Sequence, residues 1–504
     1  MKDLSLIDNF GEVSAEDDNS LLNYFLSTDT VARISTGDTF LVLGRKGSGK
    51  TSIVRHFTEG SSKNSSIPLN MRNYPWGVHA KRRDHGADNI DTYVSSWRYL
   101  ICVQIAAWAL KRSYLKYHDE QKPIQQFLIE NYGETSPDLS NIIRPSRLKI
   151  TAISLMPQVL GNSLGGVDLD RKETDTNLGL ELDALSASLL ASASKLIGDC
   201  HLGSVYLHFD ELDAGLTTLD EQRRQMIIGL ILAIRSIKRD VQKSGTKIHP
   251  VLYLRTDIWD DLVFSDKNKI TQGQSVVIEW DSESLKSLIE QRLSVKIGET
   301  VAWDSFIDDQ MMRGSQPKWN HIIARTLKRP RDVIQFLNIA LRTAKKREDT
   351  PLIFTNKDIV NSRPDYSTYL KRELDDEIIP HWSKWADALT ALSAVSTETF
   401  EKSLFLDEYD KRKSSDNSMS AEEALVLLHR FSVIGYEKRS GYGGSSWVFM
   451  YEAPDAGWDA HASRFKVHSG LKEFAKLREE RITNDPNAYI IESFFDDVDS
   501  DDEG

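Results

Sequence analysis

Near the N-terminus the chain reads Thr39-Phe40-Leu41-Val42-Leu43-Gly44-Arg45-Lys46-Gly47-Ser48-Gly49-Lys50-Thr51. The last eight residues match the pattern G-x-x-x-x-G-K-[ST], and the residues before them are apolar enough for a buried parallel strand. Residues 52–57 follow with the character of the first turns of a helix. A strand, a glycine-rich loop and a helix in this order predict a phosphate-binding loop.

Each residue type in this loop has a physical reason to be there. The glycines let backbone N–H groups turn inward around the β- and γ-phosphates of a nucleoside triphosphate, and the helix N-terminus adds a partial positive charge. We expect Lys50 to reach the β- and γ-phosphate oxygens and Thr51 to offer its hydroxyl to Mg²⁺. Residues 44–51 are therefore the predicted binding residues for ATP with Mg²⁺.

A second motif follows a β-rich run at residues 204–209, which ends in Asp210-Glu211-Leu212-Asp213. An aspartate at the carboxyl end of a buried strand can hold Mg²⁺ through water, close to Thr51. The adjacent Glu211 suits a general base that polarises the attacking water. The pair favours P-loop proteins that hydrolyse ATP with a strand-borne glutamate over small GTPases and simple kinases. The alternative is that these carboxylates only cap the next helix.

Two further positions are candidates for contacts to the γ-phosphate. A predicted strand at 251–254 ends in Arg255 and Thr256, where ATPases of the AAA type place a polar sensor; these side chains could instead hydrogen-bond loop backbone. Further on, Pro330 suits the first turn of a helix, and Arg331 would project from that turn as a second sensor. The alternative for Arg331 is a solvated helix start paired with Asp332, and Arg329 is left open between the two roles.

The C-terminal part has the pattern of a winged helix. An amphipathic helix is predicted at 421–431, followed by a strand from 433, a turn at 441–444 and a return strand at 447–451. Such a module binds DNA or docks proteins. Residues 411–480 contain eleven Lys and Arg against ten Asp and Glu, so this region has no electrostatic footprint for DNA.

The predicted fold class is α/β, a three-layer P-loop core of AAA-like type with a helical insertion, then a helical lid and a winged-helix-like domain. The predicted divisions are a lead-in at 1–38, the ATPase core at 39–295 with its insertion at about 118–200, the lid at 296–370, the winged-helix-like domain at 371–490 and an acidic tail at 491–504.

Composition narrows the class of protein. The 504 residues are 40% hydrophobic and 27% charged, as in an ordinary globular protein. Their longest apolar runs are too short to span a bilayer, so no membrane association is expected and a cytoplasmic location is predicted. Cys102 and Cys200 lack metal-site spacing and are expected to be buried free thiols. A net charge of −12 gives no general reason to coat nucleic acid.

Taken together, these motifs resemble a bacterial family of P-loop ATPases related to AAA and STAND ATPases, whose genes often lie in anti-phage defence loci. The resemblance covers nearly the whole chain and rests on Phe10-Gly11 with Ala15-Glu16, Leu43–Thr51, Phe209–Asp213, Leu254–Asp257, Arg329–Asp332 and Phe465–His468. It implies ATP binding, nucleotide-dependent assembly into a homo-oligomer, and a regulatory role beside an effector. No nuclease, protease, deaminase or NADase motif is apparent, so the effector would be a separate polypeptide.

Three functions stay open at this point. The first is an oligomerising ATPase switch that controls a partner in anti-phage defence. The second is a DNA-acting ATPase, similar to origin-recognition or transposition ATPases, that grips duplex DNA with its winged helix. The third is a nucleotide-binding module with negligible turnover. The near-neutral C-terminal region favours the first over the second, and Glu211 favours turnover over the third.

Overall fold

The architecture is described from a computed structural model. The structure describes residues 2–72, 74–80, 89–143, 147–149, 158–159, 162–163, 168–170, 178–214, 219–439 and 444–479. The chain forms two compact units. The sheet unit consists of Ser27–Arg45 and Gly49–Ile278, and the helical unit consists of Met1–Leu26, Lys46–Ser48 and Glu279–Gly504.

A five-stranded sheet with only parallel pairings lies at the centre of the sheet unit. Its order is β2-β7-β8-β1-β9, with β1 (Leu41–Leu43), β2 (Ser66–Asn70), β7 (Val205–Asp210), β8 (Ile248–Leu254) and β9 (Ser275–Val277). Every residue of β1 and β7 is buried, as expected when both faces of a parallel sheet are covered by helices. The predicted α/β class with a parallel sheet is confirmed.

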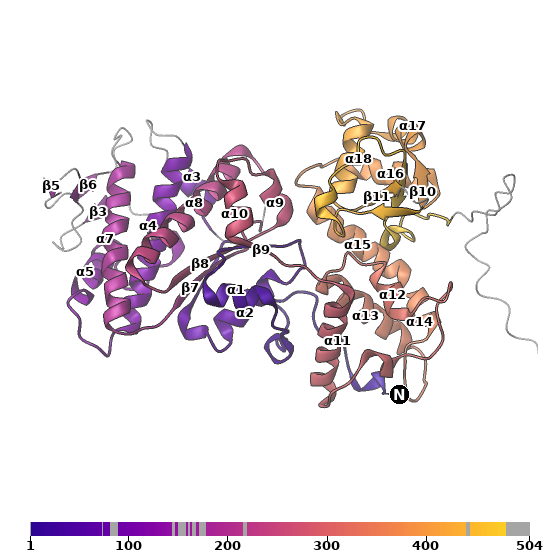
Figure 1. Ribbon diagram of the computed structural model, residues 1–504, viewed down its shortest axis with the longest axis horizontal. Coiled ribbons are helices and arrows are strands. Elements are labelled where there is room, and N and C mark those ends of the chain that lie inside the picture. The colour runs from indigo at the N-terminus through magenta and orange to yellow at the C-terminus, as the bar shows by residue number, and fades with distance from the viewer. Residues whose placement is uncertain are drawn as a thin grey trace, which may run out of the picture. The chain divides into compact units, whose positions relative to one another are not determined.

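Helices cover the two faces of this sheet (Figure 1). On one side lie α1 (Asp29–Thr36) and α2 (Lys50–Glu59). On the other lie α4 (Asn89–Arg112) and α8 (Glu221–Ser244), and the Trp97 indole of α4 donates a hydrogen bond to the Met226 carbonyl of α8 at 2.9 Å. Shorter helices complete the unit: α3 (Trp76–Ala80), α9 (Thr256–Asp261) and α10 (Lys267–Gly273).

The region predicted as a helical insertion contains α5 (Gln121–Tyr132), α6 (Leu139–Ile143) and α7 (Leu178–Asp199). It also holds two short antiparallel ladders that the sequence analysis did not predict. They pair β3 (Arg147–Lys149) with β6 (Asp168–Asp170) and β4 (Gln158–Val159) with β5 (Asn162–Ser163). Much of the stretch from 144 to 177 within this predicted insertion lies outside the described residues. Cys102 and Cys200 are buried free thiols as predicted, and burial raises the pKa of Cys102 to about 12.

The helical unit combines eight helices of the described chain with a four-stranded antiparallel sheet of order β10-β13-β11-β12. The helices are α11 (Ser282–Ile297), α12 (Lys318–Ile323), α13 (Pro330–Ala344), α14 (Asn356–Asn361), α15 (Arg363–Ile378), α16 (Trp385–Val395), α17 (Lys402–Arg412) and α18 (Ala421–Arg430). The strands are β10 (Thr399–Glu401), β11 (Ile434–Arg439), β12 (Ser445–Val448) and β13 (Arg464–Val467).

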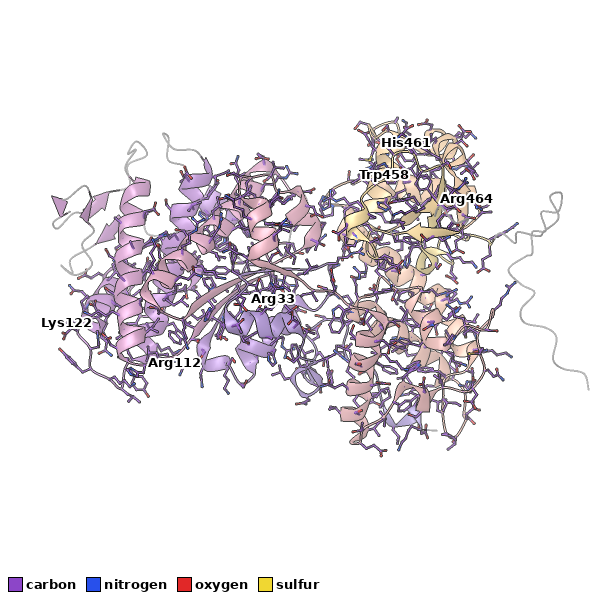
Figure 2. The ribbon with its side chains drawn as sticks, viewed as in Figure 1. Arg33, Arg112, Lys122, Trp458, His461 and Arg464 are labelled. Atoms are coloured by element: carbon purple, nitrogen blue, oxygen red, sulfur yellow. The ribbon has the colours of Figure 1, made fainter. Side chains whose placement is uncertain are left out.

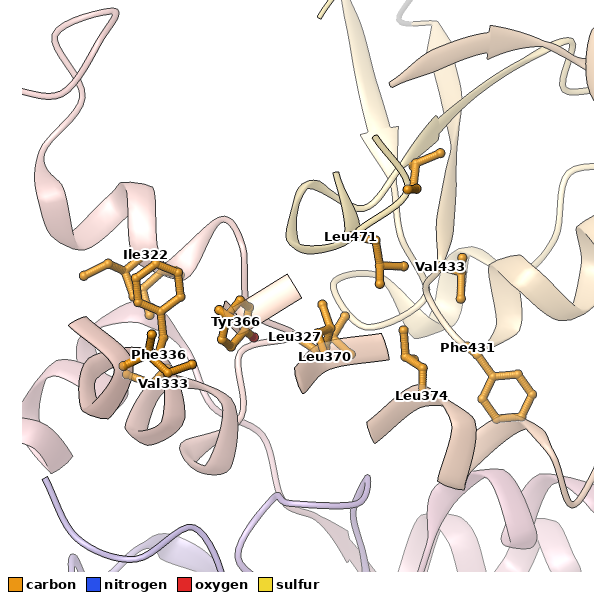
Figure 3. Close-up of a cluster of buried hydrophobic side chains, with 14 of the residues drawn as sticks. Ile322, Leu327, Val333, Phe336, Tyr366, Leu370, Leu374, Phe431, Val433 and Leu471 are labelled. Atoms are coloured by element: carbon orange, nitrogen blue, oxygen red, sulfur yellow. The ribbon is translucent and has the colours of Figure 1, made fainter. Parts of the chain in front are cut away.

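One hydrophobic core runs through this unit. Figure 3 shows side chains of α13 and α15 in one cluster with Phe431, Val433 and Leu471 of the C-terminal region. The N-terminal segment joins the same core through Phe10, which is buried. So does α11, which the sequence-based division had placed at the end of the ATPase core. Leu285 and Ile289 on its apolar face explain this difference, because they pack in the helical unit.

Local signals placed several element boundaries correctly. Asp281 is the N-cap of α11 and forms a capping box with Ser284, and Pro330 is in the first turn of α13. In the C-terminal region α18 and the antiparallel hairpin of β11 and β12 are present, with Tyr436 opposite Val448. Residues 441–443 of the predicted turn and the tail at 491–504 lie outside the described residues. Among the described helices, none has the length and apolar composition needed to cross a membrane.

Candidate functional site

The glycine-rich loop joins the end of β1 to the start of α2. Gly49 is the N-cap of α2 with a φ of 103°, and Gly47 has a φ of 78°. Both angles lie in the left-handed region that favours glycine. The N–H of Gly44 donates to the Leu254 carbonyl at 3.2 Å, which ties the start of the loop to β8. The sequence motif therefore has the strand–loop–helix geometry that a phosphate loop requires.

The ammonium group of Lys50 lies within this loop. Its Nζ donates to the carbonyl oxygens of Gly44 at 2.9 Å and Arg45 at 3.0 Å. Burial lowers the pKa of Lys50, while the carboxylates of Asp213 and Asp210 act in the opposite direction. A desolvated cation that is neutralised only in part is a strong attractor for phosphate oxygens.

Asp210 is the last residue of β7 and lies close enough to Thr51 for the Thr51 hydroxyl to favour the ionised carboxylate. Burial raises the pKa of Asp210 to about 6, against the opposing effects of its hydrogen bonds and of Lys50. In the described chain, no three Asp, Glu, His or Cys side chains come together as an all-protein metal site. Mg²⁺ commonly uses one or two protein oxygens together with substrate phosphates and water. The pairing of Thr51 with Asp210 fits that mode of binding.

Glu211 follows at a turn of the backbone with a φ of 59°, which is uncommon for a glutamate. Positive φ at a non-glycine residue costs of order 1–3 kcal/mol and often occurs at functional sites. The Glu211 side chain is 11% exposed, and its Oε2 lies 3.1 Å from Nε of Arg72. The sequence analysis missed Arg72. A signal did exist, because β2 pairs with β7 in a register that sets Asn70 opposite Asp210, two residues before Arg72.

The predicted sensors Arg255 and Thr256 lie directly after β8, the strand between β7 and β1. The Arg255 guanidinium is buried and binds Asp257 through two hydrogen bonds, at 3.0 and 2.6 Å. Its Nη1 also lies 3.4 Å from Asp213. Thr256 is the first residue of α9. Arg255 is thus held by carboxylates at the carboxyl end of the sheet.

Within the helical unit, Arg331 of α13 packs against the tip of the loop. The N–H of Arg331 lies 3.4 Å from the Gly47 carbonyl, and its Nη1 lies 3.2 Å from Glu373 of α15. Glu373 is also 3.4 Å from Nζ of Lys46, which pairs more closely with Asp376 at 2.5 Å. Lys46 of the phosphate loop and Arg331 of α13 therefore share the carboxylate of Glu373. The sequence analysis did not single out these acidic residues, although their spacing puts them on one face of a helix.

Arg329 has a different environment from the solvated helix start that was one expectation for it. The side chain is 2% exposed and pairs with Asp332 at 2.8 Å and with Glu377. Its Nη1 also donates to the Lys46 carbonyl at 3.0 Å. Arg329 therefore fixes the backbone of the loop tip to α13 and α15.

The fold is α/β with a parallel five-stranded sheet, and a strand, glycine-rich loop and helix follow one another at β1 and α2. Residues 283–375 match the family described as the FunZ-associated C-terminal helical domain, which covers α11 to α15. The chain is 24% identical over 369 residues to the putative transposon gamma-delta 80.3 kDa protein of Escherichia coli strain K12. That match covers 69% of this chain and 48% of the relative, so the chain spans about half the length of the curated relative it matches.

A solved structure is similar over most of the chain, but only weakly. The crystal structure of Cdc6p from Pyrobaculum aerophilum covers 91% of this chain and 97% of its own, at 11% identity and a TM-score of 0.30. A score this low carries no argument about function.

Proposed function

We propose that this chain binds ATP with Mg²⁺ and hydrolyses it as a regulatory ATPase. One observation carries the proposal: Lys50, Thr51 and Asp210 are brought together at the carboxyl ends of β1 and β7. These residues come from two motifs about 160 positions apart in the sequence. A cation, a hydroxyl and a carboxylate in this arrangement suit the phosphates and the metal ion of a bound nucleotide.

Each residue has a role in the proposed reaction. Lys50 leaves the loop carbonyls to bind phosphate oxygens, and Thr51 and Asp210 hold Mg²⁺, which neutralises charge that develops on the phosphates. Glu211 accepts a proton from the attacking water, and a general base of this kind contributes about 10²- to 10⁴-fold in rate. Arg331 and Lys46 are proposed to exchange Glu373 for phosphate oxygens when nucleotide binds. Arg255 and Thr256 remain proposed sensors.

Calorimetric titration with ATP and Mg²⁺ tests the binding step. Lys50→Ala should lose about 2–4 kcal/mol of binding free energy, or roughly 30- to 1000-fold in affinity, because a charge-assisted contact is removed. Lys243→Ala is a matched control, since Lys243 lies on α8 and its side chain is 80% exposed. Equal affinity of Lys50→Ala and the wild type would show that the nucleotide site has been misplaced.

The transposon description of the relative supports a second candidate, a DNA-acting ATPase. In this account the C-terminal helices and the β11–β12 hairpin form the predicted winged helix. The near-equal numbers of acidic and basic residues at 411–480 support instead a role in protein docking. Control of a separate effector and a setting in anti-phage defence rest on the sequence resemblance alone. Binding of a duplex oligonucleotide in a gel-shift assay separates the two candidates.

We also propose that ATP promotes self-association and that an arginine from a neighbouring copy completes the site. The candidates are Arg223, Arg224 and Arg235 of α8 with Arg329 and Arg331 of α13, and their contacts differ. Arg235 pairs with Asp266 at 2.7 Å, and Arg223 lies over the Trp76 ring at 3.9 Å. Among the described residues, Arg224 has a longer contact, to Glu221 at 3.6 Å, and its side chain is 35% exposed. Arg224→Ala should therefore reduce hydrolysis but leave ATP binding unchanged.

A further inference from the structure

A groove on the sheet unit is lined by none of the phosphate-loop residues, and the proposed ATPase reaction does not use it. It is a cavity of about 840 Å³ between the C-terminal end of α4, the start of α5 and the segment that leads into β2. Its lining includes Lys63, Trp108, Lys111, Arg112, Tyr114 and Gln121. The described residues that line it provide three cations and no carboxylate, in a chain whose net charge is −12.

The cations of this groove come from two separate segments. Lys111 and Arg112 end α4, where basic side chains also favour the negative end of the helix dipole. Lys63 approaches from the segment before β2, and the Arg112 guanidinium donates to the Asn64 carbonyl at 2.5 Å. The dipole of α4 therefore accounts for only two of the three cations. Figure 2 shows Arg112, with Lys122 of α5, at the periphery of this unit.

Two aromatic residues flank Lys111 and Arg112 in the sequence and line the same groove. Trp108 lines the groove, and Tyr114 is 75% exposed at its edge. Three positions further on, Tyr117 is 91% exposed. A single exposed aromatic side chain needs no explanation, but Tyr114 and Trp108 line the same groove as three cations, and grouped exposed apolar side chains mark interaction sites.

The acidic residues near the rim are engaged in local structure. Asp138 accepts hydrogen bonds from the N–H of Asn141 at 2.7 Å and from the Ser140 hydroxyl at 2.8 Å, at the start of α6. Glu134 accepts from the Asn141 side chain at 3.1 Å. Glu120 pairs with Lys195 at 3.1 Å. The hydrogen bonds orient Asp138 and Glu134 within local structure, and the ion pair with Lys195 offsets the charge of Glu120.

We propose that this groove binds single-stranded nucleic acid. Lys63, Lys111 and Arg112 contact successive phosphates, and an unpaired base stacks on Tyr114. An exposed aromatic ring beside cations suits a single strand, because its bases are free to stack on the ring. The bases of a duplex are already stacked on one another. An acidic peptide would match the cations, but only aromatic residues within it could stack on Tyr114, whereas every base of a single strand offers a planar face. The proposal does not depend on ATP hydrolysis.

Fluorescence anisotropy with a labelled oligothymidylate of about 15 nucleotides tests the proposal on the full chain, within the usual range of site sizes. The assay uses Lys50→Ala without nucleotide, so that the outcome is independent of the ATPase. Lys63→Ala with Lys111→Ala should weaken binding and reduce the slope of log affinity against log salt by about 1.4, since each phosphate contact contributes about 0.7 on a single strand. Tyr114→Ala should weaken binding roughly 5- to 150-fold through lost stacking.

The matched control is Lys243→Ala with Lys269→Ala, because both side chains are highly exposed in the same unit and lie outside the groove. This control should bind as the parent does. The proposal is overturned if the oligonucleotide fails to bind, or if the groove variants bind it like the control. It is also overturned if polyglutamate binds as tightly as the oligonucleotide and without dependence on Tyr114, which would indicate an acidic protein partner.

Discussion

Gly47 has two independent reasons to be glycine. Its φ of 78° is unfavourable for other residues, and a Cβ at this position would lie 2.9 Å from Cβ of Arg331. Sequence patterns predict the first reason, because the phosphate-loop motif requires glycine there. They do not predict the second, since the approach of α13 to the loop depends on how distant segments pack.

Gly47→Ala should therefore lower the thermal stability and weaken ATP binding, because the loop tip or Arg331 must move. The left-handed conformation alone costs roughly 1–2 kcal/mol for a residue with a Cβ. Gly198→Ala is the control: Gly198 lies in α7, and an added Cβ there meets no atom within 4 Å. Thermal unfolding and ATP titration of both variants measure these two effects. Unchanged stability and ATP affinity in Gly47→Ala would contradict the packing of Arg331 against Gly47.

Arg72 pairs with Glu211, with Nε at 3.1 Å from Oε2. A guanidinium beside a carboxylate favours its ionised form and makes it a weaker base. A pair this exposed is worth about 0.2–1 kcal/mol, so Arg72→Ala should raise ATP turnover by at most about fivefold. Arg72→Lys, which keeps the charge, should stay near the wild-type rate. A fall in turnover for Arg72→Ala would show instead that Arg72 assists the reaction.

At the scale of elements, the sequence predicted the strand–loop–helix, the strand that ends in Asp210, the start of α13 at Pro330 and the C-terminal hairpin. These features depend on residues within a few positions of one another. It did not predict that α15 supplies the acidic partners of the loop tip. In the sequence, Glu373 and Asp376 look like ordinary acidic residues of a solvated helix face. Their contacts with Lys46 and Arg331 become visible only when α15 is placed beside α13 and Lys46.

Glu373→Gln should increase ATP affinity roughly two- to tenfold. The carboxylate of Glu373 competes with phosphate for Lys46 and Arg331, and glutamine keeps its shape without the charge. Asp376→Asn is the comparison, because Asp376 contacts Lys46 and its side chain is 66% exposed; it should have a smaller effect. Calorimetric titration with ATP checks that Glu373→Gln gains more affinity than Asp376→Asn. A loss of affinity in Glu373→Gln would show that Glu373 does not compete with phosphate for these cations.

At the scale of the whole molecule, stability should fall with decreasing pH because of His321 on α12. Burial, together with the charges of Arg325, Arg363 and Lys472, lowers the pKa of His321 from 6.5 to about 2. Its Nδ1 lies 3.1 Å from Oε1 of Gln316, which fits a neutral ring. Below pH 6.5 the unfolded chain therefore binds a proton that the folded chain does not, so protonation favours unfolding.

Between pH 7.5 and pH 5 this one group should cost about 2 kcal/mol of unfolding free energy. His321→Gln should remove that part of the pH dependence, whatever its effect on stability at pH 7.5. Denaturant unfolding at both pH values gives the pH dependence of the unfolding free energy for the variant and the wild type. The difference between them is the contribution of His321, because the other titrating groups are the same in both proteins. The same pH dependence in both proteins would contradict a neutral buried His321.

The sequence also predicted the α/β class of the whole chain, because the phosphate loop and the acidic strand each identify a buried parallel strand. The sequence did not indicate which core α11 and the N-terminal segment would join. Both join the core of the helical unit through apolar residues such as Leu285 and Phe10, and an apolar face alone does not show which core it will pack against.

The most direct test of the central claim is to measure ATP binding and ATP hydrolysis in the same preparation of Glu211→Gln. Glutamine keeps the shape of the side chain but cannot accept a proton from water. The account predicts ATP affinity close to that of the wild type, with turnover reduced by roughly 100-fold or more. Wild-type turnover in this variant would contradict the assignment of Glu211 as the base and, with it, the proposed mechanism.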